Sequence, residues 1–252
     1  MSETLTITID GKECTCEKGE YLYDVAKRNG IFIPVLCRSD AFADHRACCR
    51  VCIVEVTTRG RTKIVTSCIY PVNEPCEVQT QSDEIKEERA VIFALLHARA
   101  PESQRITEMN KWLGGTGFDR LVTLDNEKCV LCGLCVQACA SLGTGAISTI
   151  NRGTEKMIDT PYGKPSEYCV GCLSCANVCP TGAISFSENE DTRTIWNRTF
   201  ELQRCEKCGK VMGTRESVAH SVKGTLTELP TVCDECKKRE TADALMKAYR
   251  NA

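Results

Sequence analysis

The chain has 252 residues, and its 32 basic and 34 acidic side chains leave a formal net charge of −2. Because basic and acidic side chains are nearly equal in number, the composition indicates neither a nucleic-acid-binding protein nor a polybasic membrane anchor. The 20 cysteines are the unusual feature, because small domains this rich in cysteine usually depend on metals or disulfides for stability. Residues 1–16 lack the features of an export signal, and the longest apolar stretch, Ala90–Leu96, is too short to span a membrane. We therefore expect a cytoplasmic protein whose thiols hold metal.

The first 80 residues predict a small domain of strands and one helix. Apolar residues alternate with threonines over residues 3–9, which predicts a strand, and Asp10-Gly11 predicts a turn into a second strand over Lys12–Cys16. Gly19-Glu20 opens a predicted helix in which Leu22, Val25 and Ala26 share one face, and Asn29-Gly30 supplies its C-terminal stop.

Two further strands are expected over Arg50–Thr57 and Lys63–Ser67, around a turn at Arg59-Gly60. The order strand, strand, helix, strands is typical of a β-grasp domain.

Four cysteines fall in the loops and strand ends of this pattern: Cys37, Cys49, Cys52 and Cys68. Two irons bridged by two sulfides need two thiolates each, so four cysteines suit one [2Fe–2S] cluster. Cys48 is an alternative to Cys49 by its distance from Cys37, but the Cys-x2-Cys spacing to Cys52 favours Cys49. We interpret the remaining cysteines of this region as buried small hydrophobic residues, with a redox-sensitive thiol as the alternative: Cys14, Cys16 and Cys76.

Two segments of this region, Cys49–Val56 and Thr66–Val72, resemble the [2Fe–2S] domain at the start of the large iron–sulfur subunit of respiratory complex I. They equally resemble the diaphorase small subunit of NAD-linked hydrogenases. The resemblance covers about residues 1–80 and implies one [2Fe–2S] cluster held by the four cysteines named above.

The next segment departs from the complex I relatives. A helix is expected over residues 83–100, capped by Ser82 or Asp83 and stopped by Pro101. In those relatives a comparable helix leads into a cluster held by one histidine and three cysteines. No cysteine follows His97 until after residue 124, so that cluster is not expected and His97 is interpreted as a surface or packing residue. Residues 114–117 are glycine-rich and are expected to form a flexible joint.

Two matching cysteine runs follow, each with the spacing Cys-x2-Cys-x2-Cys-x3-Cys: Cys129, Cys132, Cys135 and Cys139, then Cys169, Cys172, Cys175 and Cys179. Three thiolates on one tight loop bind three irons of a cube, and in a two-cluster domain the fourth cysteine of each run serves the other cluster. We therefore expect Cys179 to complete the first [4Fe–4S] cluster and Cys139 to complete the second. Structural disulfides or zinc fit a doubled three-plus-one pattern poorly.

The residues after each run also repeat, with Gly145–Ser148 after the first and Gly182–Ser185 after the second. Residues 120–190 resemble bacterial-type two-cluster ferredoxins, in which each half is a cluster loop, a short helix and a strand. Ala140 replaces the proline usual after the fourth cysteine, whereas Pro180 keeps it.

The C-terminal region has two Cys-x2-Cys knuckles, Cys205 with Cys208 and Cys233 with Cys236. Four thiolates at this spacing suit one tetrahedral metal. Both knuckles look like zinc-ribbon or rubredoxin turns, so zinc is expected, with a third [4Fe–4S] cluster as the alternative. Residues 209–232 have little apolar pattern and are expected to form a loop with His220 exposed, before a short helix over Lys237–Arg250.

These expectations describe an α+β protein in four parts: a β-grasp domain over residues 1–80, a helical linker over 81–119, a two-cluster ferredoxin domain over 120–192 and a small four-cysteine metal-ribbon unit over 193–252. No Gly-x-Gly-x-x-Gly unit follows a strand, and no nucleophile lies beside a base, so no catalytic residue is expected.

The resemblances imply an electron-transfer subunit of an NAD(P)-linked oxidoreductase, and they extend to complexes that bifurcate electrons. The implied partners are a complex I-type NADH-oxidising flavoprotein subunit and a hydrogenase, formate dehydrogenase or second NAD(P)/ferredoxin-linked subunit. A free multi-cluster ferredoxin and a redox-sensing zinc-ribbon regulator are the alternatives.

Overall fold

The computed structural model describes residues 3–42, 45–113, 127–223 and 228–250. The chain divides into two compact units, which are interleaved in sequence. The first unit contains residues 1–138 and 178–183, and the second contains residues 139–177 and 184–252. The glycine-rich joint expected at residues 114–117 lies outside the described residues.

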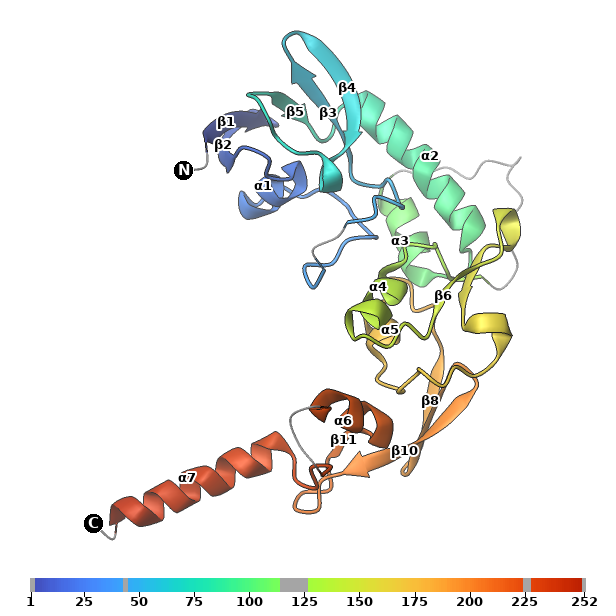
Figure 1. The fold of residues 1–252 in the computed structure, drawn as a ribbon. Helices are drawn as coiled ribbons and strands as arrows, with labels where there is room; N and C mark the ends of the chain where they lie inside the picture. The colour runs from blue at the N-terminus through green and yellow to red at the C-terminus, as the bar shows by residue number, and fades with distance from the viewer. Residues whose placement is uncertain (1–2, 43–44, 114–126, 224–227, 251–252) are drawn as a thin grey trace. The chain divides into compact units, whose positions relative to one another are not determined.

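The first unit begins with a five-stranded mixed sheet in the order β2-β1-β5-β3-β4 (Figure 1). Its strands are β1 (Thr4–Ile9), β2 (Lys12–Glu17), β3 (Ile53–Thr58), β4 (Arg61–Thr66) and β5 (Glu77–Gln79). Helix α1 (Leu22–Arg28) buries Leu22, Val25 and Ala26 against this sheet. The β-grasp arrangement and the α+β fold class predicted from the sequence are confirmed.

Cys14 and Cys16 lie on β2 opposite Ile7 and Leu5 of β1, and both are buried in the core of the sheet. Cys76 is partly buried against the same core. The structure thus places all three in the environment expected for small hydrophobic side chains.

Strand β5 was not anticipated from the sequence. It has three residues, of which Val78 alone is buried, so no alternating pattern can mark it. It pairs in parallel with β1 and antiparallel with β3, and therefore joins the two hairpins into one sheet.

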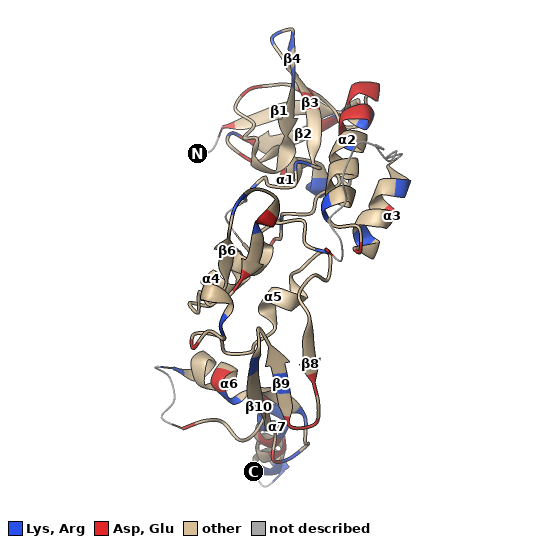
Figure 2. Cartoon of the chain, turned by 90° about the vertical axis from the view of Figure 1, so that its right-hand side faces the viewer, with Lys and Arg blue, Asp and Glu red and all other residues tan. Residues whose placement is uncertain are grey.

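Helices α2 (Asp83–Arg99) and α3 (Gln104–Trp112) follow the sheet. Ser82, one of the two expected caps, accepts a hydrogen bond from the Ile85 amide. The acidic start of α2 (Figure 2) suits the positive end of the helix dipole. Arg89 is buried on this helix and donates to the carbonyl oxygens of Val51 and Ile53, at 3.1 and 2.7 Å. It thereby fastens α2 to the start of β3.

The cysteine runs lie on loops that lead into short helices, as predicted. Helix α4 (Leu134–Ser141) follows the first loop, and helix α5 (Ser174–Asn177) follows the second. The strands after them join different sheets: β6 (Ser148–Ile150) pairs with β7 (Met157–Asp159), whereas β8 (Phe186–Glu188) joins the sheet of the C-terminal region.

The C-terminal region is more ordered than its sequence indicates. A sheet in the order β11-β10-β9-β8 contains β9 (Thr192–Ile195), β10 (Arg198–Arg204) and β11 (Val211–Thr214). Helices α6 (Arg215–Val222) and α7 (Asp234–Arg250) complete it.

The loop expected over residues 209–232, with an exposed His220, is therefore wrong in part. His220 lies half-buried on α6, and its Nε2 donates to the carbonyl oxygen of Leu142 at 2.6 Å. The Thr214 side chain caps this helix by accepting from the Ser217 amide, and Val218 anchors it in the interior. One buried apolar residue in eight left no periodic signal in the sequence.

Candidate metal centres

The four cysteines expected to hold the [2Fe–2S] cluster lie together. Cys37 follows α1, Cys49 and Cys52 precede β3, and Cys68 lies in a single 3₁₀ turn at Ser67–Ile69. All four are buried, with at most 3% of each residue exposed. The Cys37 thiol contacts those of Cys49 and Cys68, and the Cys68 thiol contacts that of Cys52.

The structure separates Cys48 from this group. Cys48 is exposed, and its Sγ lies 3.5 Å from the carbonyl oxygen of Arg46. Positive φ angles at Ala47 and Arg50 turn the backbone around the site, so that Cys49 points inward. The geometry therefore favours Cys49 over Cys48, as the spacing does.

The electrostatics of these four thiols suit a bound cation. Hydrogen bonds from the Cys49 and Cys68 thiols, and from the amides of Cys48 and Cys49, lower the pKa of Cys37 to about 2. The pKa of Cys68 is raised, because its thiol proton is held by hydrogen bonds to the sulfurs of Cys37 and Cys52. Four thiolates cannot crowd a buried site without positive charge between them, and iron would supply that charge.

The first [4Fe–4S] site gathers four cysteines within the first unit: Cys129, Cys132, Cys135 and Cys179. Burial raises the pKa of Cys132 and of Cys135 to about 12, and negative charge on Cys179 adds to both shifts. Backbone amides face the sulfurs: the Leu131 amide donates to Cys129 Sγ at 3.4 Å and the Ala183 amide donates to Cys179 Sγ at 3.3 Å.

The second [4Fe–4S] site gathers the other four within the second unit: Cys139, Cys169, Cys172 and Cys175. They line one small cavity, together with Ile147, Ile195 and Trp196. Thr144 Oγ1 and the Ala146 amide each lie 3.1 Å from Cys139 Sγ. The structure thus brings the fourth cysteine of each run to the first three of the other.

One apolar core joins the [2Fe–2S] site to the loop of the first cysteine run. It contains Leu36, Cys37, Cys49, Val51, Phe93, Ala100, Ile106, Met109, Val130, Cys132 and Leu134. Gly133 of the loop lies against the Arg46 side chain so closely that a Cβ there would lie 2.8 Å from Arg46 Nη1. Helices α2 and α3, which follow the β-grasp domain, contribute Phe93, Ile106 and Met109 to this core.

The loop of the second run is held by the C-terminal sheet. Arg193 on β9 donates to the Gly171 carbonyl at 2.9 Å, and Arg198 on β10 donates to the Cys169 carbonyl at 2.8 Å. Gly171 packs against Phe200, and the Thr214 hydroxyl donates to the Val170 carbonyl. Sequence reasoning missed these supporting residues, because isolated arginines and one phenylalanine form no motif.

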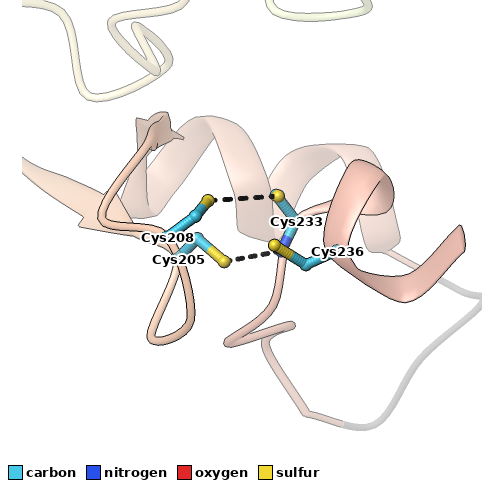
Figure 3. Close-up of side chains that lie close together, drawn as sticks. All are labelled: Cys205, Cys208, Cys233 and Cys236. Atoms are coloured by element: carbon cyan, nitrogen blue, oxygen red, sulfur yellow. Dashed lines mark hydrogen bonds between the residues drawn. The ribbon is translucent and has the colours of Figure 1, made fainter. Parts of the chain in front are cut away.

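The C-terminal cysteines form a compact four-sulfur group (Figure 3). The ligand atoms of Cys205, Cys208, Cys233 and Cys236 all lie within 4.8 Å of one another. Cys208 Sγ and Cys233 Sγ are 3.7 Å apart, and the Cys233 amide donates to Cys205 Sγ at 3.3 Å. The amides of Cys233, Cys208 and Lys207 lower the pKa of Cys205 to about 6.

Two different backbone elements present these sulfurs. Gly209, with φ of +72°, closes a tight turn after Cys208, and its amide donates to the Cys205 carbonyl at 2.9 Å. Cys233 and Cys236 lie at the first turn of α7. Both elements direct amide groups toward the sulfurs, which favours the thiolate form that metals bind.

Comparisons with known protein families agree with this geometry. The family of 2Fe-2S iron-sulfur cluster binding domains matches residues 2–83. Two families of 4Fe-4S dicluster domains match residues 122–186 and 168–213. The chain is an iron–sulfur protein. The expected [2Fe–2S] and [4Fe–4S] domains are confirmed, in the predicted order.

Two relatives of this iron–sulfur protein are 31% identical to it. One is the HndD subunit of the NADP-reducing hydrogenase of Solidesulfovibrio fructosivorans, over 71% of this chain and 36% of the relative. The other is the alpha subunit of an NADPH-Fe(3+) oxidoreductase from Geobacter sulfurreducens, over 81% of this chain and 26% of the relative. The chain therefore spans about a third or less of the length of these relatives.

A solved structure has the same fold. The crystal structure of an NAD+-reducing [NiFe]-hydrogenase in the H2-reduced state aligns with a TM-score of 0.61 and 24% identity, over 71% of this iron–sulfur chain and 86% of the other. Among the described residues, no helix has the length and apolar character needed to cross a bilayer.

Proposed function

We propose that the chain relays single electrons within a multi-subunit NAD(P)-linked oxidoreductase. The shared apolar core carries this proposal, because it packs the [2Fe–2S] cysteines Cys37 and Cys49 against Cys132 of the first [4Fe–4S] loop. The relatives support it, since their names describe a subunit of an NADP-reducing hydrogenase and a subunit of an NADPH-linked oxidoreductase.

The proposed ligands follow the grouping of the thiols. Cys37, Cys49, Cys52 and Cys68 hold the [2Fe–2S] cluster; Cys129, Cys132, Cys135 and Cys179 hold the first [4Fe–4S] cluster; Cys139, Cys169, Cys172 and Cys175 hold the second. Bound clusters of these types accept and release one electron at a time, at potentials set by burial, charge and hydrogen bonds to sulfur.

The protein determines where the proposed clusters lie and which groups surround them. Burial is the main cause of the raised pKa of Cys132, and negative charge on Cys37 of the other site adds to it, because the two thiols are close enough to interact. Only 1% of Cys37 and 6% of Cys132 is exposed. The buried residues between the two sites keep water away, and amides such as that of Leu131 donate to the sulfurs.

For the C-terminal cysteines we propose zinc. Ligands at the usual Zn–S distance of about 2.3 Å lie about 3.8 Å from one another in a tetrahedron, close to the 3.7 Å between Cys208 and Cys233. A four-iron cube binds each cysteine to a different iron, and so holds the sulfurs further apart. Metal analysis tests the assignment: we expect about ten irons and one zinc per chain, whereas about fourteen irons without zinc would establish a third cubane.

The proposed partners are an NADH-oxidising flavoprotein subunit of the complex I type and one further redox subunit. The latter would be a hydrogenase, a formate dehydrogenase or a second NAD(P)/ferredoxin-linked protein. Electron bifurcation stays a prediction for the complex, since it requires a flavin on another subunit.

Purification of the native complex tests the relay. We expect the untagged chain to elute with a flavoprotein subunit on size exclusion, and NADH or NADPH to reduce its clusters only in that complex. A stable monomer that carries all its iron would contradict the proposal and favour a free ferredoxin. Rapid-freeze EPR would then show whether any added flavoprotein reduces it.

A further inference from the structure

Trp196 occupies an unusual backbone position beside the second [4Fe–4S] site. It forms, with Asn197, the two-residue turn between β9 and β10, and the two residues have φ angles of +53° and +57°. Such type I′ turns favour Asn-Gly, because both central residues are left-handed. Asn197 suits its position, but a bulky side chain in this region is a strained exception. Strain of this kind is often retained where a side chain has a function.

The indole of Trp196 points its polar atom into the protein. The side chain lines the cavity that contains Cys139, Cys169, Cys172 and Cys175. Its Nε1 is fully buried and donates no regular hydrogen bond to any residue that the structure describes. A buried indole N–H normally has an acceptor, so this donor is positioned for a group that belongs in the cavity.

Cys175 supplies one of the four sulfurs that line this cavity together with Trp196. The Trp196 side chain lies close enough to the Cys175 thiol to interact with it, although its N–H does not reach regular hydrogen-bond geometry. A thiolate that binds iron is a stronger acceptor than a thiol.

We propose that the Trp196 N–H donates a hydrogen bond to sulfur of the second [4Fe–4S] cluster, at Cys175, and thereby raises its reduction potential. This inference rests on the ligand set proposed above. Reduction adds negative charge to the cluster and its thiolates, so a donor to sulfur stabilises the reduced form more than the oxidised form. Trp196 thus acts on the potential of the cluster through the Cys175 sulfur and does not bind iron itself.

Trp196 also distinguishes the two cubane sites. The repeated halves supply equivalent donors: Thr144 and Ala146 lie near Cys139 Sγ, as Thr181 and Ala183 lie near Cys179 Sγ. Trp196 comes from the β9–β10 turn, outside the repeat. It therefore gives one of two similar clusters an additional donor, which separates their potentials.

The test compares Trp196→Phe with Trp112→Phe in the full chain. Phenylalanine keeps an aromatic ring and removes the N–H. Trp112 is 64% exposed and belongs to the first unit, so its replacement controls for the loss of a tryptophan. Potentials are measured by EPR-monitored redox titration, with iron content determined for each variant.

We expect Trp196→Phe to make reduction of one [4Fe–4S] cluster about tenfold less favourable, which is 59 mV for one electron. The other two clusters keep their potentials, and Trp112→Phe changes none. Unchanged potentials in Trp196→Phe, at full iron content, would overturn the proposal.

A second measurement covers the case in which Trp196→Phe loses the cluster. In the reduced wild-type chain, ENDOR spectroscopy should detect an exchangeable proton and, after labelling of tryptophan with 15N at the indole, a nitrogen coupled to one [4Fe–4S] cluster. Absence of both couplings overturns the proposal. A wild-type chain with fewer than two [4Fe–4S] signals instead contradicts the proposed ligand set itself, so the two failures are distinguishable.

Discussion

Replacement of Gly171 by alanine tests whether the C-terminal sheet holds the second cysteine loop. A Cβ on Gly171 would lie 2.7 Å from Cδ2 of Phe200 and 3.0 Å from Cγ2 of Thr214. Phe200 is 1% exposed and cannot swing into solvent. The φ of +65° at Gly171 adds a second cost, because side chains are disfavoured in the left-handed region.

The magnitude follows from these two contributions. Overpacking a filled interior costs about 1 to 3 kcal/mol, and a left-handed alanine costs about 1 to 2 kcal/mol. Gly153 is a matched control, since its φ is +62° and nothing lies within 4 Å of its Cβ position. Gly153→Ala carries only the backbone cost, so Gly171→Ala should be less stable than this control by about 1 to 3 kcal/mol.

Loss of clusters on unfolding is irreversible, so the assay measures a rate. The rate at which visible cluster absorbance disappears in urea should be about fivefold to a hundredfold higher in Gly171→Ala than in Gly153→Ala. EPR should show that a [4Fe–4S] signal is lost first while the [2Fe–2S] signal persists. Equal rates in the two variants would refute the claim that contact with Phe200 and Thr214 holds the loop.

The remaining predictions concern individual cysteines. Cys49→Ser should abolish the [2Fe–2S] EPR signal and Cys48→Ser should keep it; the reverse result would assign Cys48 as the ligand. Cys208→Ser should lose the zinc and retain about ten irons, and loss of iron instead would contradict the zinc assignment. Because burial raises the pKa of Cys76 to about 11, this thiol stays protonated near neutral pH. Mass spectrometry should therefore find it alkylated more slowly than the exposed Cys48 at about pH 8, and faster labelling of Cys76 would count against its burial.

The sequence predicts those parts of the fold that have a local pattern. The β1–β2 hairpin was recognisable, because alternation and the Asp10-Gly11 turn act together over a few residues. Strand β5 was not, because a three-residue strand depends on pairing with β1 and β3. Helix α6 was missed for a related reason, since its stability comes from the Thr214 cap and the packing of Val218.

The candidate ligands were predictable because cluster chemistry dictates cysteine spacing. What surrounds the ligands was not. Arg198 donates to a carbonyl next to the cavity from 29 residues away in the sequence, and no rule connects such a pair before the fold is known. Trp196 is a second example, because only the fold shows that its buried N–H lies beside Cys175.

The interleaved division of the chain has a consequence for synthesis on the ribosome. The first unit includes residues 178–183, so it remains incomplete until residues 139–177 have also been made. The cysteines proposed to hold the [2Fe–2S] cluster, the last of which is Cys68, all emerge much earlier. The nascent chain can therefore receive its first cluster while it is still being translated. The two proposed [4Fe–4S] clusters each take a ligand from the second cysteine run, so under the proposed ligand set neither can be completed until that run has been made.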